Sequence, residues 1–434
     1  MNRLERCIKL LKGQNIFLTG GAGTGKSFLT KQIVTKYITA KKNIVVLGST
    51  GISAVNINGQ TIHSFFIFNI SSNFDELEVS DRYNKSRIKD LNKIISKLDL
   101  LVIDEISMVS SNMMDMIVYR LRNGGFKGRI LVVGDFFQLP PIVKKNSSNL
   151  LFDEALYAFE SSGWDYLNFL NINLTQIKRT SDKEFMEILS KVRIGEVDNK
   201  VLSYLTRLKD QVIKANEPTI LYGRNAEATR LNRQKLQALP QKEFVIESQK
   251  TKRDSKLSDK RVASWINSLP VEDSLLLKEG AKVIFTTNKW GSYHNGQRAI
   301  IEHIEDDHIV VSSLKTGKLM KVDRFEFDLN RTVIDKDNEV KNESQYSLKQ
   351  FPLRLCYAIT IHKSQGMSID ELICNVENIF ATSQFYVALS RATNPKSLKI
   401  EFNRDYFDKY LQRVIQVSDT VKKFYKIEKF EEIE

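Results

Sequence analysis

Cysteine is scarce in this chain of 434 residues, and the three that occur, Cys7, Cys356 and Cys374, are far apart. An odd number of cysteines without metal-ligand spacing predicts neither a disulfide framework nor a zinc site. Long hydrophobic runs are also lacking, since no apolar stretch approaches the length of a membrane span. The first twelve residues are interrupted by charge too often for a signal peptide. We therefore expect a protein of the reducing cytoplasm without a membrane partner.

Internal repeats and low-complexity tracts are absent as well, so a solenoid is not expected. With 42% hydrophobic and 27% charged residues, the chain has the composition of an ordinary folded protein, and its length allows two or three domains. Lys and Arg outnumber Asp and Glu by 65 to 52, which gives a net charge of +13. A basic surplus favours polyanionic partners, but it does not establish nucleic-acid binding by itself.

Short apolar runs alternate with helical patterns in the first third of the chain, which is typical of buried parallel strands in a doubly wound α/β domain. The expected strands are Asn15–Thr19, Asn43–Gly48, Leu98–Ile103 and Arg129–Val133, and the expected helices include Ser27–Ala40 and Asn112–Arg122.

A second α/β pattern begins with the expected strand Thr219–Tyr222 and helix Ala226–Leu239. The stretch 241–274 is polar and carries the basic run Lys250–Arg253, which indicates a solvated insertion rather than a specific site. Closely spaced strands then predict a small β-barrel inserted in this second domain. These strands are Lys282–Thr286, Arg298–Ile304, His308–Ser313 and Leu319–Val322. The α/β pattern resumes near Phe351, and the chain from Asp405 onward is expected to be helical.

A phosphate-binding loop is predicted at Gly20–Ser27, whose sequence GGAGTGKS lies between an expected strand and an expected helix. Glycines let backbone N–H groups wrap phosphates at the start of a helix, Lys26 would place a cation beside the β and γ phosphates, and the Ser27 hydroxyl could ligate Mg²⁺. A glycine-rich turn that matches the pattern by chance is the alternative.

Two further segments follow strands as catalytic groups of a nucleotide hydrolase do. Asp104 would hold Mg²⁺ and Glu105 would activate water, although an Asp-Glu pair can also cap a helix. Gln138, within Gly134–Pro141, could sense the γ phosphate, but the same glycine and prolines could simply form a turn.

These motifs, together with later ones, resemble the ordered motifs of the Pif-type helicases of superfamily one. The resemblance covers about residues 14 to 401. It rests on Ser49–Ala54, Gly59–Phe66, Asp104–Met108, Gly134–Pro141, Leu174–Arg179, Phe185–Glu196, Leu275–Val283, Asn295–Gly296, Ala358–Asp370 and Tyr386–Ala392.

The resemblance implies an α/β fold with two RecA-like P-loop motor domains, ATP and Mg²⁺ bound between them, and a small SH3-like β-barrel insertion. The implied domains are residues 1–168 for the first motor, with a wedge insertion at about 66–84, residues 169–288 and 351–404 for the second, 289–350 for the barrel, and 405–434 for C-terminal helices.

Roles at the nucleotide follow from the matched motifs. Arg179 and Arg391 resemble two arginines that reach the γ phosphate from the second motor domain, although either could form an ordinary salt bridge. Gln365 and Gly366 resemble the segment that links nucleotide state to DNA grip. The residues expected to contact the nucleotide itself are Gly21, Ala22, Gly23, Thr24, Gly25, Lys26, Ser27 and Phe28.

Positions that match family contacts with single-stranded DNA, mostly at phosphates, are Thr50, Gly51, Thr61, His63, Phe66, His362, Lys363 and Ser364. His63 taken alone would more often be a structural histidine. Aromatic residues near it could stack on bases or form the wedge, and several of them could equally be core. These residues are Phe65, Phe66, Phe68 and Phe74.

The implied activity is ATP-dependent movement from the five-prime to the three-prime end of single-stranded DNA, with unwinding of forked duplex in replication, repair, recombination or telomere maintenance. G-quadruplexes and RNA–DNA hybrids remain open as substrates, and protein partners are unknown. A monomer associated with a bacterial-like nucleoid is expected. Two alternatives are a DNA-binding clamp that remodels partners without unwinding and a small-molecule kinase that uses only the phosphate loop.

One departure from the family pattern concerns the adenine base. Many members carry a glutamine in an N-terminal helix that reads the adenine edge, whereas no glutamine occurs in the thirteen residues before Gln14. The sequence therefore leaves open whether other nucleotides serve as well as ATP.

Overall fold

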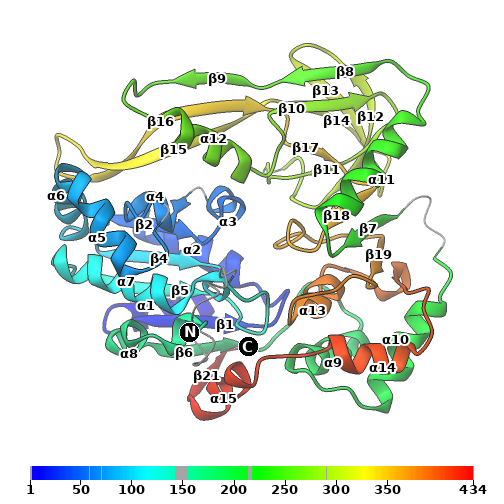
Figure 1. The fold of residues 1–434 in the computed structure, drawn as a ribbon, viewed down its shortest axis with the longest axis horizontal. Helices are drawn as coiled ribbons and strands as arrows, with labels where there is room; N and C mark the ends of the chain where they lie inside the picture. The colour runs from blue at the N-terminus through cyan, green and yellow to red at the C-terminus, as the bar shows by residue number, and fades with distance from the viewer. Residues whose placement is uncertain are drawn as a thin grey trace. The chain divides into compact units, whose positions relative to one another are not determined.

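The computed structural model describes residues 2–57, 59–69, 71–141, 155–213, 218–289 and 291–433. They form two compact units (Figure 1). The first comprises Met1–Lys178, Asn330–Glu343 and Ser418–Glu434, and the second comprises Arg179–Leu329 and Ser344–Val417.

The first unit is built on a parallel sheet of seven strands. Every residue of β1 and β4 is buried, because helices cover both faces of the sheet and continuous apolar runs can then be accommodated. In spatial order the strands are β21 (Phe430–Ile433), β6 (Leu170–Leu174), β1 (Ile16–Gly20), β5 (Arg129–Val133), β4 (Leu100–Asp104), β2 (Ile44–Gly48) and β3 (Gln60–Thr61).

Most helices of this unit begin where a polar side chain accepts one of the first free backbone N–H groups, whereas α2, α6 and α15 have no such cap. Asn2 caps the first helix with a reciprocal Glu5 contact, and Ser110 caps α7. The helices are α1 (Arg3–Leu11), α2 (Lys26–Thr39), α3 (Gly51–Asn56), α4 (Ile62–Phe65), α5 (Phe74–Tyr83), α6 (Lys85–Ile95), α7 (Ser111–Asn123), α8 (Ser162–Leu167) and α15 (Asp419–Ile427), with 3₁₀ turns at Ile106–Met108 and Ala158–Glu160. The expected parallel strands and the first two expected helices are thus confirmed within one or two residues at each end.

The first unit differs from the predicted domain 1–168 in two respects. Strand β6 pairs with β1 inside the seven-stranded sheet, so the first unit extends to Lys178 rather than to residue 168. The predicted C-terminal helices are followed by β21, which pairs with β6 and adds an edge strand to the same sheet. The last stretch of the chain therefore belongs to the core of the first unit, where α15 contributes Val421 and Phe424.

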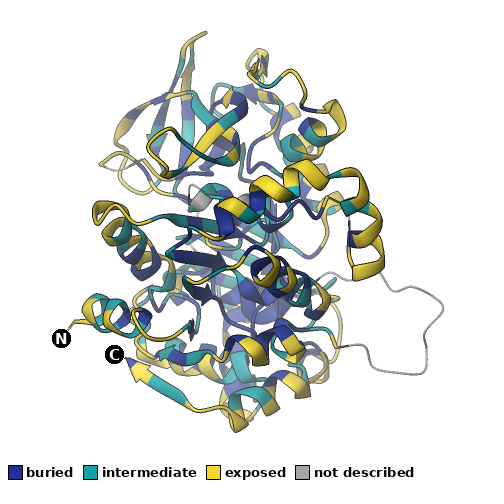
Figure 2. Ribbon diagram, turned by 90° about the vertical axis from the view of Figure 1, so that its left-hand side faces the viewer, coloured by how far each residue is buried: buried dark blue, intermediate teal, exposed yellow. Residues whose placement is uncertain are grey.

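The second unit contains a smaller parallel sheet of four strands, as the recurrence of the α/β pattern predicts. Its strands are, in spatial order, β18 (Ala358–Thr360), β7 (Thr219–Tyr222), β19 (Leu372–Asn375) and β20 (Leu398–Glu401). Its helices are α9 (Lys183–Ile194), α10 (Asn199–Asp210), α11 (Asn225–Gln237), α12 (Asp259–Ser268), α13 (Gln384–Leu389) and α14 (Phe407–Val414), with a 3₁₀ turn at Pro395–Ser397. As Figure 2 shows, strands are mostly buried and the outer faces of helices are mostly exposed.

Antiparallel strands of the second unit form three further sheets. The five-stranded sheet is β14 (Leu319–Asp323), β13 (His308–Ser313), β12 (Arg298–Ile304), β11 (Lys282–Phe285) and β17 (Leu353–Leu355). The others are β15 (Phe325–Ile334) with β16 (Val340–Gln350) and β9 (Gln249–Lys252), and β10 (Ser274–Lys278) with β8 (Glu243–Glu247). The strands expected here are confirmed, and the likeness to an SH3 barrel stays a prediction.

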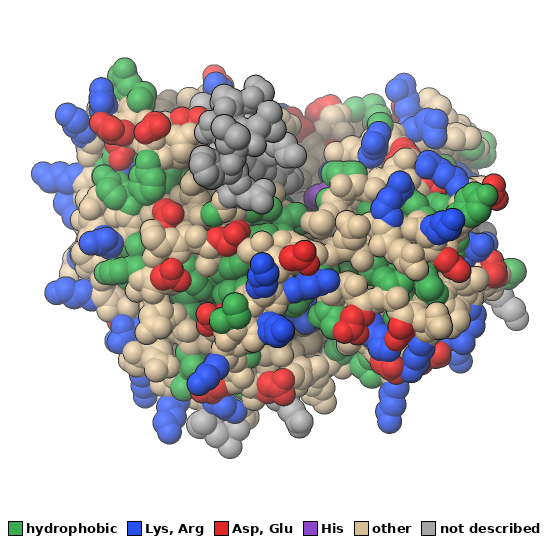
Figure 3. Space-filling view, turned by 60° about the horizontal axis from the view of Figure 1, so that its bottom comes forward, with side chains coloured by type: hydrophobic (Ala, Val, Ile, Leu, Met, Phe, Trp, Pro, Cys, Tyr) green, Lys and Arg blue, Asp and Glu red, His purple; other side chains and the backbone are tan. Residues whose placement is uncertain are grey.

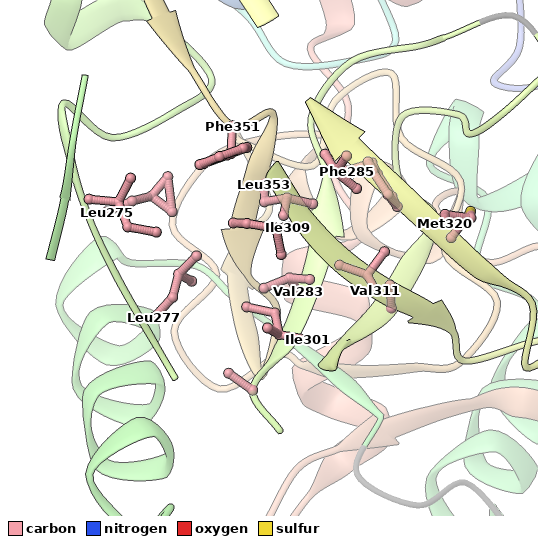
Figure 4. Packing of buried hydrophobic residues seen from close by; sticks show 14 of the residues in the cluster. Leu275, Leu277, Val283, Phe285, Ile301, Ile309, Val311, Met320, Phe351 and Leu353 are labelled. Carbon is pink, nitrogen blue, oxygen red and sulfur yellow. The ribbon is translucent and has the colours of Figure 1, made fainter. Parts of the chain in front are cut away.

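A hydrophobic core joins the five-stranded sheet to β10 (Figure 4). Val283, Phe285 and Leu353 belong to this core, yet they lie outside the predicted insertion 289–350. The barrel-like body is therefore larger than the predicted range. The polar stretch 241–274 also contributes β8, β9 and α12, and every residue of β9 is exposed.

The tip of the β15–β16 hairpin, Asn330–Glu343, packs with the first unit. The Asn43 side-chain oxygen accepts the Val340 N–H at 3.0 Å, and the buried Gln60 side chain contacts Thr332. Part of the predicted insertion thus completes the surface of the first unit. Among the described residues, no helix combines the length and apolar character needed to cross a membrane.

Candidate nucleotide site and nucleic-acid interface

Five parallel strands bring the predicted motifs of the first unit to one edge of its sheet. The order β1-β5-β4-β2-β3 places neighbouring carboxyl ends side by side. The phosphate loop follows β1, Asp104 ends β4, and Gly134 follows β5. Ligands of open parallel sheets bind at this edge, so the nucleotide motifs converge as the sequence predicts.

The phosphate loop has a backbone that only glycine tolerates at two positions. A Cβ added to Gly20 would lie 2.5 Å from the Leu174 carbonyl oxygen, and Gly25 has φ of 94° at the N-cap of α2. Gly21, Ala22, Gly23 and Thr24 form the turn between them. The first N–H groups of α2 have no partner within the helix, and they face the turn where phosphate oxygens are bound in such loops.

Lys26 is held by the loop itself. Its Nζ donates to the carbonyl oxygens of Gly20 at 2.6 Å and Gly21 at 3.1 Å. A phosphate oxygen would compete for these ammonium donors, because charge-assisted hydrogen bonds are stronger than those to neutral carbonyls. Phe28, which was also expected to contact the nucleotide, is 65% exposed beyond the loop.

Asp104 and Glu105 form a pair of carboxyl groups at the end of β4. Asp104 is 7% exposed, and its Oδ1 accepts the Glu105 N–H at 3.0 Å. Burial, and then the Glu105 charge, raise the pKa of Asp104, whereas Lys26 lowers it. Glu105 adopts a left-handed backbone with φ of 54°, which is uncommon outside glycine and clusters at functional sites.

The chemistry of these donors fits Mg²⁺. A carboxylate whose charged form is disfavoured by burial would be relieved by a divalent cation, and Mg²⁺ binds through one or two carboxylates together with substrate phosphates. Among the described residues, no cluster of three His, Cys, Asp or Glu side chains could hold a metal without such phosphates. Asp104 and Ser27 are accordingly the residues that would hold the ion.

Gln138 lies at the same edge, after β5. It is buried, its N–H donates to the Asp135 carbonyl at 2.8 Å, and its side chain lies 3.5 Å from the Asp135 carboxylate. Asp135 is fully buried and also accepts the Phe137 N–H. The segment is therefore a hydrogen-bonded turn, as the alternative interpretation held, and the Gln138 amide is directed at the Asp135 carboxylate.

One residue at this edge was not predicted. The Tyr425 hydroxyl in α15 lies 2.7 Å from Thr19 Oγ1, just before the phosphate loop, and accepts the Phe136 N–H at 3.4 Å. Its ring stacks on Phe137 with centroids 4.5 Å apart. Tyr425 thus connects the C-terminal helix to both nucleotide segments. Sequence reasoning could not find it, because 406 residues separate Tyr425 from Thr19 and no local pattern marks the contact.

Arg179 and Arg391 lie together in the second unit. Arg179 Nη1 donates to the Ser390 carbonyl, and burial together with the Arg391 charge lowers the Arg179 pKa to about 9. Tyr386 opposes that shift. Two like charges held close are disfavoured unless an anion joins them, so this pair is suited to a phosphate.

Arg391 is also bonded to the segment predicted to meet DNA. It is 2% exposed, its Nε donates to the Val387 carbonyl at 3.0 Å, and its Nη1 donates to the Ser364 carbonyl at 3.3 Å. Any movement of this guanidinium toward a phosphate would break the hydrogen bond to the Ser364 carbonyl and replace it with one to a phosphate oxygen. The second unit therefore contains a direct physical link between a predicted phosphate-binding arginine and the predicted DNA segment.

The DNA positions of the first unit follow β2 and β3, whose pairing places Gly48 opposite Thr61. Thr50 and Thr61 cap α3 and α4 through their hydroxyls. Gly51 is the first residue of α3. Burial lowers the pKa of the half-buried His63, so its ring is uncharged at neutral pH. These residues lie at the nucleotide edge.

The Phe66 side chain, which was predicted to contact DNA, lies in the core of the first unit. The ring is fully buried, lies 5.4 Å from Phe68 in a stacked arrangement, and cannot reach a base. Phe65 is buried too, whereas Phe74 is 44% exposed. The Phe66 carbonyl accepts Nε of the buried Arg120, so the start of the predicted wedge is core. Residue 70 of that range lies outside the described residues.

The second predicted DNA segment follows β18. His362 and Lys363 are half-buried, and burial lowers the pKa of both. The Ser364 side chain is fully buried and donates to the Ile361 carbonyl at 2.8 Å, and its contact with DNA stays a prediction. Gln365 and Gly366 complete the turn, and Gly366 has φ of 74°.

Charged side chains of both signs lie on the face of the molecule drawn in Figure 3. On the face drawn in Figure 3, Lys and Arg side chains are interspersed with Asp and Glu. This face shows no continuous basic track, so the interface is argued from individual residues.

Comparisons with known proteins agree with the geometry. Residues 2–202 match the family model described as PIF1-like helicase. The ATP-dependent DNA helicase Pif1 of Campylobacter jejuni is 41% identical, over 99% of this chain and 98% of the relative. A crystal structure of Bacteroides Pif1 with ADP-AlF4 matches with a TM-score of 0.81 at 29% identity, covering 98% of this chain and 96% of that one. Bacteroides Pif1 bound to single-stranded DNA matches with a TM-score of 0.65 at 29% identity, covering 98% and 95%.

The fold and the relatives thus support the α/β organisation with RecA-like domains. With a relative this similar along nearly the whole of both sequences, the chain belongs to the PIF1-like helicase family.

Proposed function

We propose that the chain is an ATP-dependent DNA helicase that moves five-prime to three-prime on single-stranded DNA and separates forked duplex. One observation carries the proposal. The nucleotide motifs after β1, β4 and β5 and the predicted DNA motifs after β2 and β3 share one edge of one sheet. The Ser49 N–H donates to the Asp104 carbonyl at 3.3 Å, so a backbone movement of either motif would displace the other.

The chemistry at the nucleotide follows from these side chains. The loop N–H groups and Lys26 bind phosphate oxygens, and Asp104 with Ser27 would hold Mg²⁺, which supplies charge neutralisation when bound. Glu105 accepts a proton from the attacking water. Arg179 and Arg391 of the second unit stabilise the negative charge that develops on the phosphate, because arginine donors fit phosphate oxygens in pairs.

Movement follows if nucleotide binding and hydrolysis alter both DNA grips. In the first unit the grip is formed by Thr50, Gly51, Thr61 and His63, and in the second unit by His362 and Lys363. The Arg391–Ser364 contact provides the coupling in the second unit. Support for single-stranded DNA as the partner comes from the bound state of Bacteroides Pif1. We also propose that Gln365 and Gly366 link the nucleotide state to the DNA grip. The predicted limits of the two motor domains belong to the same proposal.

Strand separation on tailed duplexes tests the proposal. We expect wild type to unwind a duplex with a five-prime tail and to leave one with a three-prime tail paired. Lys26→Ala should abolish unwinding, whereas Lys31→Ala, an exposed lysine on the same helix, should match wild type. DNA-stimulated ATP hydrolysis without unwinding of either substrate would instead identify the clamp that remodels partners, and preference for the three-prime tail would contradict the direction.

A further inference from the structure

Phe380 is a large aromatic residue that lies outside every motif used above. It occupies the loop between β19 and α13 of the second unit (Figure 1), and 63% of its surface is exposed. A single exposed aromatic is ordinary, so its surroundings must decide whether it has a role.

The loop presents Phe380 on a fixed backbone. The side chain of the fully buried Gln384 accepts two N–H groups, from Phe380 at 3.0 Å and from Ala381 at 3.2 Å. Two residues earlier, the Asn378 amide donates to Glu227 of α11 at 2.6 Å. These bonds hold the loop at both sides of the ring. A ligand that used the ring would therefore bind without the entropic cost of ordering the loop.

The neighbour of Phe380 is a residue of the predicted DNA segment. The ring of His362 is inclined to it by only 18°, with centroids 6.0 Å apart, which is an offset stack. Burial lowers the pKa of His362, so its imidazole is uncharged at neutral pH and suits contact with an aromatic face rather than a phosphate. Lys363, next in sequence, supplies a cation for the backbone.

We propose that Phe380, extended by His362, forms a stacking platform for an unpaired base of the DNA strand. The ligand class is a nucleobase of single-stranded DNA, and every base has a face that can stack, so the contact would be tolerant of sequence. This inference rests on the proposed function, and it adds a base contact to a track otherwise assigned to phosphates. Phe380 is then a DNA-binding residue of the second grip.

Binding of two oligonucleotides distinguishes stacking from phosphate contacts. One is oligothymidine, and the other has the same number of phosphates on an abasic backbone. Wild type should prefer oligothymidine. Phe380→Ala should weaken oligothymidine binding by roughly 5- to 150-fold, the range for loss of one stacked base, and should leave abasic binding unchanged.

Three further variants sharpen the result. Phe380→Leu keeps an apolar side chain without the aromatic face and should resemble the alanine variant. Phe380→Trp should restore binding and show fluorescence quenching by oligothymidine but not by the abasic strand. Tyr406→Ala removes an aromatic ring of the same unit that is 75% exposed and should match wild type.

Equal binding of oligothymidine by wild type and Phe380→Ala would overturn the inference. An equal loss for both oligonucleotides would do so too, because it would indicate a structural effect. In either case, ATP hydrolysis that is stimulated by DNA in wild type leaves the proposed function intact. If wild type itself shows no such stimulation, the proposed function fails first.

Discussion

The predicted wedge depends on one buried ion pair, and its removal should separate strand opening from ATP hydrolysis. Arg120 of α7 is 2% exposed, and its guanidinium binds the Asp81 carboxylate of α5 through both nitrogens, one at 2.6 Å. Asp81→Ala leaves that guanidinium buried without its counter-charge. Loss of one partner of a buried pair costs about 3–5 kcal/mol.

The lower end of that range applies, because the Asp81 side chain is 22% exposed. About 3 kcal/mol corresponds to a roughly 100-fold shift toward undocked α5. Arg120→Met should cost less than Asp81→Ala, since the remaining carboxylate can reach water and the remaining guanidinium cannot. The double variant Arg120→Met with Asp81→Leu should recover most of the loss.

Two assays report the effect. Amide hydrogen exchange should accelerate in α5 of Asp81→Ala, and forked-duplex unwinding should fall while DNA-stimulated ATP hydrolysis stays near wild type. Arg82→Ala is the matched control, because Arg82 lies on the same helix and forms an exposed pair with Glu78. Identical exchange and unwinding in Asp81→Ala and Arg82→Ala would refute the reasoning.

Three other outcomes are expected. Tyr425→Phe keeps the stacking on Phe137 but loses the hydroxyl contacts to Thr19 and Phe136. We expect a lower kcat for ATP hydrolysis with little change in KM. If the effects of Tyr425→Phe and Thr19→Val were additive in the double variant, the contact between the two hydroxyls would not be the cause. Burial raises the pKa of Asp104, so the metal-free protein should lose stability as pH rises from about 4 toward the folded pKa. Mg²⁺ should bind more tightly over the same rise in pH. In Asp104→Asn, thermal unfolding and Mg²⁺ titration should show neither trend. The three cysteines are buried, and burial raises the pKa of each thiol, that of Cys7 to about 11. A thiol reagent should therefore label them only after denaturation. Rapid labelling of the native protein would contradict this prediction.

Much of the fold could be predicted because the strands that carry the motifs are mostly buried. Leu100–Ile103 and Ile130–Val133 are apolar without interruption, and short apolar runs between helical segments are typical of buried parallel strands. The last strand could not be found in this way. Its sequence, Phe-Glu-Glu-Ile, is half acidic and does not resemble a buried strand. It forms because the backbone of β6 pairs with it at the edge of the sheet.

The site was predictable in position but not in orientation. A motif fixes which strand end a residue follows, and Lys26, Asp104 and Gln138 accordingly lie at one edge. It does not fix where each side chain points. Phe66 and Ser364 belong to motifs that match DNA-binding segments, yet both side chains are fully buried. Contacts between distant segments, such as Tyr425 with Thr19, leave no local signal at all.

Steady-state ATP hydrolysis, with and without single-stranded DNA, tests the central claim that one sheet edge couples nucleotide to DNA. Wild type should be strongly stimulated by DNA, Lys26→Ala should be inactive in both conditions, and Lys31→Ala should behave as wild type. Hydrolysis by wild type that does not respond to DNA would contradict the coupling and favour a kinase-like use of the phosphate loop.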